Sequence, residues 1–484
     1  MSYGVLHGRR TVSKGREKAA KEAFRLNSRS RRVKRLVALV VSAALLSLSG
    51  VAAAAPSQAD LLKAVAKPDG VLTRGEFAQL LVQASGIGRA GQGADLLAQK
   101  GIMKGAPGAG LDLEQPITRV EAVALVGRTL GLTDDVLPPQ ETAAQLEPGH
   151  WGYNLYAWLS REGLVSGDPA ATLSEKEGAA FLSQVFTTDQ DVLDIMKKSQ
   201  ARSKEIKAMR AAMSGSMKLI PRPGAEGADE LPSIAPSMQI TQEVVLPDRI
   251  HQTSTVKMIL PDGKEQAMTT EMYLADGEMY QKLPDPKTGK VGWFRYPKGL
   301  MPDLGQILKQ AQQQTEVIPP GMEDYLHYKL LGTTEVDGQK VYEIAFYGRV
   351  DDFQKFLSAA LGQFAGAEEM QKSLAQATEM IDSFSFWGIT YVGAADYLTK
   401  KAEYSMVITY APKFQGEEIP IQALQMSMQT DEYTYDPNLK LEVPAEVLEA
   451  PELELPENTV SPGEPSSEQP LGTVPTPAPA APQP

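Results

Sequence analysis

Two arginines stand one residue after the cap of a predicted helix, where a cation can bind an anionic ligand. The segment "TRGE" at 73–76 returns as "TRVE" at 118–121, 45 residues later (118 − 73 = 45). Threonine and the glutamate three residues on form a capping box, which needs no arginine. Arg74 and Arg119 are therefore surplus to the helix signal. Because a helix N-terminus attracts anions, a surplus arginine at this place predicts an anion-binding site. A solvated or structural role for both arginines is the alternative.

A tryptophan supplies a candidate aromatic contact for the same ligand. Trp151 lies in "PGHWGYNLYAWLSREG" and starts an i, i+4, i+7, i+8 stripe with Leu155, Trp158 and Leu159. This spacing predicts a helix with one buried side, on which Tyr153 and Trp158 are predicted to pack. Two interpretations of Trp151 stay open, namely contact with a ligand and packing in the core.

A third, altered copy of the motif begins the stretch "LSEKEGAAFLSQVF" at Leu173. Ser174 and Glu177 keep the capping box, but Glu175 stands where the other copies have arginine. The loop before this copy is also shorter than the corresponding loop before the second copy, by six residues (13 − 7). We therefore predict that the third copy packs against the others and binds no anion.

The order of these motifs resembles a known family of repeats. "GIMKG" precedes the second capping box, "GLVSG" precedes the third, and a His-Trp-x-Tyr helix stands before the latter. This order resembles the S-layer homology domain, which covers about a quarter of the chain, at 60–187. The three copies are placed at about 60–88, 94–132 and 146–187.

The resemblance implies a fold and a function for this region. The fold would be all-α, with three tandem copies that form a helical pseudo-trimer. Proteins of this family are held non-covalently on secondary cell-wall polysaccharide, often through a pyruvylated sugar. The expected polysaccharide-binding residues are then Arg74, Arg119 and Trp151.

The N-terminal 54 residues are predicted to be a signal peptide. All the charged residues before Ala55, twelve Lys or Arg and two Glu, lie in residues 1–35. A short apolar core and then small residues follow them. Cleavage is expected after Ala54, with Ala59 as the second choice. The protein would then be secreted and held at the cell wall or S-layer surface. The alternative is a retained membrane anchor, because the stretch 36–55 is long enough to span a bilayer.

Charge and composition exclude several classes of function. The whole chain has a formal net charge of −12, and the leader contributes +10 (12 − 2), so the remainder carries −22 (−12 − 10). An acidic protein is repelled by nucleic acid, so no nucleic-acid partner is expected. There is no cysteine and there are four widely separated histidines, so neither a metal site nor a cofactor is expected. No catalytic motif occurs, and the protein is predicted not to be an enzyme.

The region 189–450 is predicted to be an α+β domain. A helix is expected from Asp189 to about Met213, followed by a Pro/Gly-rich linker and a large antiparallel sheet. Hairpin turns are signalled by Asp-Gly pairs at 262–263, 276–277 and 337–338. An amphipathic helical segment is expected from about Asp352 to Met380. The tail, 451–484, is rich in Pro, Ser and Glu and is predicted to be disordered.

One hairpin of this domain carries a second resemblance. The segment "EMYLADGEMYQKLPDPKTGKVGWFRYP" resembles the strand-turn-strand and Gly-x-Trp strand of lipoprotein carriers and related Gram-positive lipoproteins. That resemblance implies a half-barrel in which one face of the sheet lines an apolar cavity. Sixteen of the 18 methionines lie after residue 189. Methionine is adaptable and common on promiscuous apolar surfaces, so these residues either line a cleft for a hydrophobic ligand or fill the core.

Two functions follow from the sequence. The first is a cell-surface protein attached to wall polysaccharide, which displays a β-rich domain of unknown ligand. The alternative is an exported carrier or binding protein for a lipid or another hydrophobic ligand, with vestigial repeats.

Overall fold

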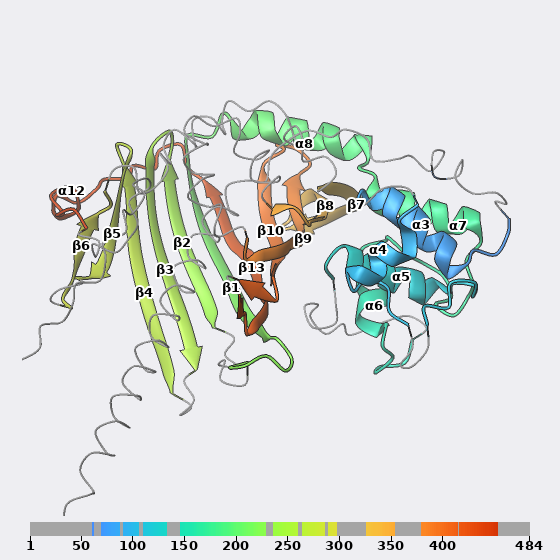
Figure 1. Cartoon of the computed structure of the whole chain (residues 1–484). Coiled ribbons are helices and arrows are strands. Elements are labelled where there is room, and N and C mark those ends of the chain that lie inside the picture. Colours follow the sequence, from blue (N-terminus) through green and yellow to red (C-terminus); the bar gives the residue numbers. More distant parts are fainter. Residues whose placement is uncertain are drawn as a thin grey trace, which may run out of the picture.

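A helical region and a large sheet make up the described part of the molecule (Figure 1). The computed structural model describes residues 61, 69–87, 91–105, 110–132, 146–228, 236–259, 264–285, 289–297, 326–353, 379–414 and 416–453. The predicted signal peptide, its cleavage sites, the first Asp-Gly turn and the tail beyond residue 453 lie outside these residues. Most of the amphipathic segment predicted at 352–380 also lies outside them. No helix among the described residues is long and apolar enough to cross a membrane.

The helical region holds the repeated motif. Its helices are α3 (Arg74–Ser85), α4 (Gly93–Gln99), α5 (Arg119–Thr129), α6 (Tyr153–Arg161) and α7 (Glu175–Phe186). The three predicted capping boxes are all present, with caps at Thr73, Thr118 and Ser174. In each one the hydroxyl accepts a hydrogen bond from the backbone of the glutamate three residues on. Local sequence therefore determines where these helices begin.

The residue that precedes each cap joins the three repeats in a closed ring. The backbone N–H of Leu72 donates to Leu173 O (2.8 Å), that of Leu173 to Ile117 O (3.1 Å), and that of Ile117 to Leu72 O (2.9 Å). Each repeat thus contacts both others through the same position. The third copy is part of the ring, as expected for a copy that packs.

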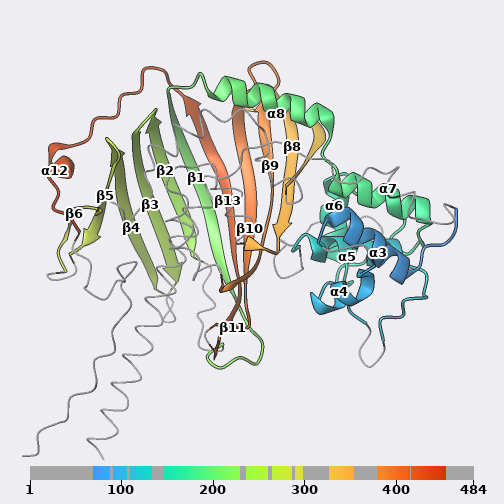
Figure 2. The same cartoon turned by 45° about the horizontal axis from the view of Figure 1, so that its top comes forward.

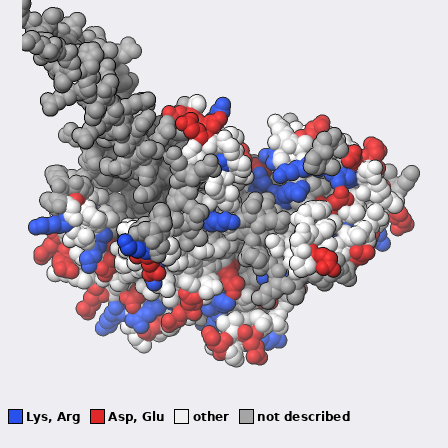
Figure 3. Space-filling view, turned by 90° about the horizontal axis from the view of Figure 1, so that it is seen from below, with Lys and Arg blue, Asp and Glu red and all other residues white. Residues whose placement is uncertain are grey.

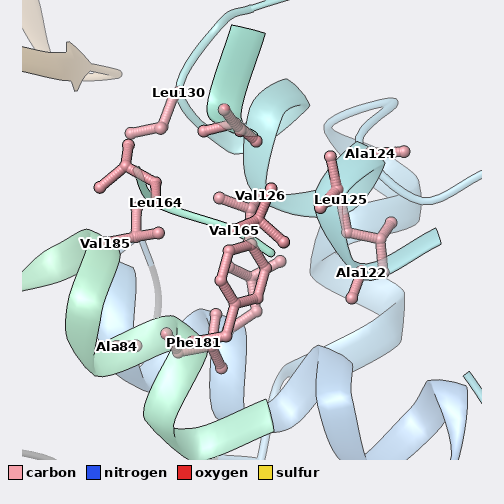
Figure 4. Packing of buried hydrophobic residues seen from close by; sticks show 14 of the residues in the cluster. Ala84, Ala122, Ala124, Leu125, Val126, Leu130, Leu164, Val165, Phe181 and Val185 are labelled. Carbon is pink, nitrogen blue, oxygen red and sulfur yellow. The ribbon is translucent and has the colours of Figure 1, made fainter. Parts of the chain in front are cut away.

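The helical region has an apolar core formed by all three repeats. Figure 4 shows Phe181 of α7 directed towards Val165 and Val126, the latter on α5. Trp158 is also buried, which confirms the prediction that it packs. Burial of large apolar side chains of this kind stabilises such a core by roughly 1.5–3 kcal/mol for each residue.

The rest of the described chain forms one antiparallel sheet with few helices. Eleven strands occur in the order β6-β5-β4-β3-β2-β1-β13-β10-β9-β8-β7. Their bounds are β1 (Ala208–Pro221), β2 (Ser237–Val245), β3 (Arg249–Ile259), β4 (Glu265–Ala275), β5 (Glu278–Pro284), β6 (Val291–Arg295), β7 (His327–Val336), β8 (Gln339–Val350), β9 (Ile381–Gly393), β10 (Thr399–Tyr410) and β13 (Ile421–Tyr435). The short strands β11 (Lys413–Phe414) and β12 (Glu417–Glu418) pair separately, and α12 is Ala445–Leu448.

Two hairpin turns lie where the sequence predicted them. Asp276 and Gly277 have φ of 53° and 79°, and Asp337 and Gly338 have φ of 50° and 72°. Positive φ at both central residues is the geometry that favours Asp-Gly in two-residue hairpins.

The prediction of a helix from Asp189 to about Met213 is confirmed in its N-terminal part and wrong in its C-terminal part. Helix α8 (Gln190–Ser203) ends ten residues early (213 − 203), and β1 starts at Ala208. The alternation of Met209, Ala211 and Met213 has the period of a strand, and pairing on both sides of β1 overrides the helical tendency of these residues.

The helical region and the sheet share a core. Tyr347 and Trp387 of the sheet belong to the same apolar cluster as the helical repeats. The Tyr347 hydroxyl donates to Val185 O (2.5 Å), and Arg349 Nη1 donates to Arg128 O (3.0 Å). The predicted boundary at 187–189 coincides with the end of α7, yet packing continues across it.

Candidate functional sites

Arg74 is held by contacts inside the helical region. Its Nη1 forms an ion pair with Glu121, the capping glutamate of the second repeat. Its Nε donates to Leu111 O (3.1 Å) and its Nη2 to Lys104 O (3.3 Å). With a side chain only 16% exposed, Arg74 links two repeats.

Arg119 repeats this arrangement one copy further on. Its Nη2 lies 3.3 Å from Glu177 Oε1, in the capping box of the third repeat, and its Nε donates to Asp168 O (3.3 Å). The pKa of Glu177 is lowered first by the hydrogen bonds from Ser174 and only then by Arg119. The structure therefore gives both predicted ligand arginines a structural partner in the next repeat.

Glu175 occupies the third equivalent position. The backbone N–H groups of Arg74, Arg119 and Glu175 donate to Gln115 O, Ala171 O and Gly70 O, respectively, each in the following repeat of the ring. Glu175 is buried, so it presents no exposed carboxylate that would repel an anionic sugar. The third copy therefore differs from the other two by a buried side chain at this position, and not by an exposed negative charge.

Trp151 is the predicted site residue that is most accessible. Its side chain is 50% exposed, and its ring lies 5.2 Å from the ring of His150. The next residue, Gly152, lies against Val120, which follows Arg119. Trp151 and Arg119 therefore lie on neighbouring segments, and Trp151 belongs to the surface and not to the core.

The methionines of the sheet all lie on one face. Met217 pairs directly with Met426, which pairs with Met406, and directly paired residues of an antiparallel sheet share a face. Residues two apart in a strand also share a face. Applied to every described strand, the registers place eleven methionines on this side: Met209, Met213, Met217, Met238, Met258, Met268, Met272, Met279, Met406, Met426 and Met428. We call this side the methionine face.

On β1–β5 the methionine face carries no charged residue. The charged residues of these strands all point to the opposite face: Arg210, Lys218, Glu243, Arg249, His251, Lys257, Glu265, Glu271, Glu278 and Lys282. Several of them form cross-strand pairs, such as Arg210 with Glu243 (2.7 Å) and Lys282 with Glu271 (3.2 Å). Seen from below, acidic and basic side chains lie side by side over the described surface (Figure 3).

Different elements cover different parts of the sheet. Helix α8 lies across one end of the sheet (Figures 1 and 2), where Val192 and Ile195 pack in one cluster with the methionine face of β7–β10, β13, β1 and β2. The helical region packs on the opposite face, through Tyr347 and Trp387. On β1–β5, the face opposite to the methionine face carries the charged residues. The C-terminal segment covers part of that charged face with Leu441 and Val447, among others.

Burial of the methionines falls from one end of the sheet to the other. Met406, Met426 and Met428 are buried, whereas Met272 on β4 is half-buried and Met268 is 55% exposed. Ile240, Val244 and Leu274 on the same face are buried, so the methionine face of β2–β5 is uncharged but accessible only in part, most of all at Met268. The sequence indicated a methionine-rich domain, and the i, i+4 spacing of methionines in β1 and their i, i+2 spacing in β13 were the signal for a single face.

Comparison with known proteins identifies the family of the sheet region. A family model described as "Family of unknown function (DUF6612)" matches residues 191–452. The chain belongs to the DUF6612 family. The matched residues comprise α8 and the sheet, and the helical repeats lie outside them. No curated protein matches the chain.

Several solved structures are similar to the chain at low identity. The lipoprotein LppX of Mycobacterium tuberculosis is 9% identical, covering 52% of this chain and 100% of that one, with a TM-score of 0.24. LprF of Mycobacterium bovis is 12% identical, over 51% of this chain and 97% of that one, also with a TM-score of 0.24. A putative outer membrane lipoprotein-sorting protein domain of Vibrio parahaemolyticus is 11% identical, over 51% and 93%, with a TM-score of 0.18. Likenesses of this size do not identify a ligand.

Proposed function

We propose that this protein binds a hydrophobic ligand on the methionine face of its sheet and serves as a carrier or binding protein outside the cytoplasm. One observation carries the proposal, namely that every methionine in the described strands lies on that face. A core needs apolar residues, but it has no need of so many flexible thioethers. Methionine suits a surface that must adapt to a chain of variable shape.

The accessible part of this face supports binding rather than packing alone. Met268 is more than half exposed, and Met272 and Met279 on the same face are half-buried. Contiguous exposed apolar surface in a folded protein commonly marks a site for a ligand or partner. The cluster that contains α8 extends only as far as Ile240 and Met238 of β2, and the helical region packs on the opposite face, so the strands β3–β5 offer the surface for the ligand.

Export is the second part of the proposal. The basic and apolar leader at 1–54 supports secretion, and the acidic remainder suits a protein that works away from nucleic acid. We infer a binding role without catalysis.

Extraction and mutation test the proposal. The full chain, purified from its native host, is extracted with organic solvent, and the extract is analysed by mass spectrometry; a co-purifying lipid is expected. The Met268→Glu variant should lose most of this lipid, because a carboxylate on the apolar face must be desolvated by the bound chain.

A matched control lies one residue away on the same strand. Ala267 is exposed on the opposite face, so Ala267→Glu should retain the lipid. Equal lipid content in both variants, or no lipid in the unmodified protein, would contradict binding on the methionine face.

Attachment to wall polysaccharide is a second candidate function. The closed ring of three repeats and the exposed Trp151 favour it, because together they offer an intact scaffold with an aromatic ring at its surface. The full chain should sediment with cell walls stripped of protein, and Trp151→Ala should weaken this retention. Unchanged sedimentation of the variant would exclude Trp151 from the site.

A further inference from the structure

A row of uncharged, half-buried amides crosses the methionine face of β2–β5. Gln242 of β2 pairs with Gln252 of β3, Gln252 with Met272 of β4, and Met272 with Gln281 of β5. We call this row, Gln242–Gln252–Met272–Gln281, the amide row. Three of its four members are therefore glutamines on the face that carries no charge.

Contacts hold these amides in place. Gln242 Nε2 lies 3.5 Å from Gln252 Oε1, and Gln252 Nε2 donates to Ser254 Oγ at 3.0 Å. Gln281 Oε1 accepts from the Tyr296 hydroxyl at 2.6 Å. A carboxamide has two donors and an acceptor with two lone pairs, so these contacts leave further capacity for hydrogen bonds.

Apolar rows lie on both sides of the amide row. On one side, Val244, Ile250, Leu274 and Met279 are paired in sequence across the strands. On the other side, beyond a row that includes Ile240, Ser254 and Thr270, lie Met238, Val256 and Met268. Residues two apart in a strand are separated by about 7 Å, so the amide row lies between apolar surfaces within reach of one lipid molecule.

We propose that the ligand is an uncharged amphiphile, an acyl lipid whose polar part is an ester, amide or hydroxyl group. The proposal rests on the function proposed above. Val244 and Leu274 are buried, so acyl chains lie on the remaining members of the apolar rows. The neutral polar group accepts and donates hydrogen bonds at the amide row. An anionic or cationic headgroup finds no opposite charge on the methionine face of β1–β5, and removal of its water is costly without one.

The test compares two probes with the same acyl chains. Delipidated full-length protein is titrated with pyrene-labelled diacylglycerol and with pyrene-labelled phosphatidylglycerol, and binding is followed by fluorescence. The neutral probe should bind at least tenfold more tightly.

A charge introduced into the amide row should change this preference. Gln242→Lys supplies a cation, so phosphatidylglycerol should gain affinity and the ratio between the probes should fall severalfold. Gln239 lies on the same strand, exposed on the opposite face, so Gln239→Lys should leave the ratio as it is. Circular dichroism of both variants establishes that the sheet is retained.

The outcomes separate this inference from the proposed function. Equal or tighter binding of phosphatidylglycerol by the unmodified protein would overturn the inference, and a hydrophobic-ligand protein would remain. Failure of both probes to bind would overturn the inference and count against the proposed function as well. A ratio that shifts equally in Gln239→Lys and Gln242→Lys would show that the amide row does not select the ligand.

Discussion

In the helical region, two arginines lie between the repeats and form ion pairs there. In β1–β5, by contrast, the charged side chains all lie on one face of the sheet. Arg74 and Arg119 each reach the capping glutamate of the next repeat. In the sheet, pairs such as Arg210 with Glu243 stay on the face opposite to the methionines. Charge in the first region specifies which repeats meet, and its segregation in the second leaves a face that suits an apolar ligand.

The largest expected effect comes from the core of the helical region. Trp158 is 5% exposed, so Trp158→Ala should destabilise the protein by roughly 3–5 kcal/mol. Trp151→Ala, at an exposed ring, is the control and should cost less than about 1 kcal/mol. Because the repeats share a core with the sheet, thermal melts followed at helix and strand wavelengths should shift together. A sheet transition that stays unchanged in Trp158→Ala would show that the two regions unfold independently.

The second effect is a dependence of stability on pH at the junction of the two regions. His327 is buried between Phe186 and Tyr347, and burial, followed by nearby Lys329, lowers its pKa from 6.5 to about 4. The neutral ring is thus favoured in the folded state. Its contribution is fully present above pH 6.5 and is lost as the pH falls towards 4, by roughly 2 kcal/mol between pH 6.5 and 5.

Denaturant unfolding at pH 7 and pH 5 measures this dependence. In His327→Leu the loss of stability between the two pH values should be smaller than in the unmodified protein by about 2 kcal/mol. The same substitution at His150, on the surface of the helical region, is the control. An equal loss in unmodified protein and His327→Leu would exclude His327 as the source.

A smaller effect is expected from the hydrogen bond between the two regions. Tyr347→Phe removes the hydroxyl that donates to Val185 O, and this carbonyl is then left buried without that donor. The free energy of unfolding should fall by about 1–2 kcal/mol. Tyr342 lies on the same strand and points to the methionine face, so Tyr342→Phe is a matched control that should cost less. Equal unfolding free energies for the two variants would contradict a role of this bond in joining the regions.

The sequence predicted best what depends on neighbouring residues. The caps at Thr73, Thr118 and Ser174 were predicted because a capping box needs only four consecutive residues. The Asp276–Gly277 turn was predicted because its φ values restrict the residue type. Such signals need no knowledge of tertiary structure.

Contacts between distant residues were not predictable in this way. The partner of Arg74 is Glu121, 47 residues away, and nothing local distinguishes such an arginine from a ligand. Met209 and Met213 were included in a helix, because the strands on both sides of them lie far along the chain. The single methionine face depends on the register of several strands, which local pattern does not determine.

The smallest expected effect tests the ring of repeats at its third position. Arg74 and Arg119 each bind the capping glutamate of the next repeat, and the ring of backbone hydrogen bonds makes Glu175 their equivalent. By this equivalence, an arginine at 175 would reach Glu76, the capping glutamate of the first repeat. The equivalent pairs of Arg74 and Arg119 are partly exposed, and pairs at a protein surface contribute only about 0.2–1 kcal/mol, so Glu175→Arg should raise the melting temperature slightly at low salt.

The source of that gain is open to direct measurement. The gain should vanish in the double variant Glu175→Arg, Glu76→Gln, and it should diminish in high salt, because screening weakens exposed pairs. Glu175 is itself buried at the third junction, the contact between the third repeat and the first. Its replacement by arginine therefore also tests whether this junction has room for the longer side chain. A lower melting temperature in Glu175→Arg would mean that the third junction is packed differently from the other two, and that arginine was replaced there because it does not fit.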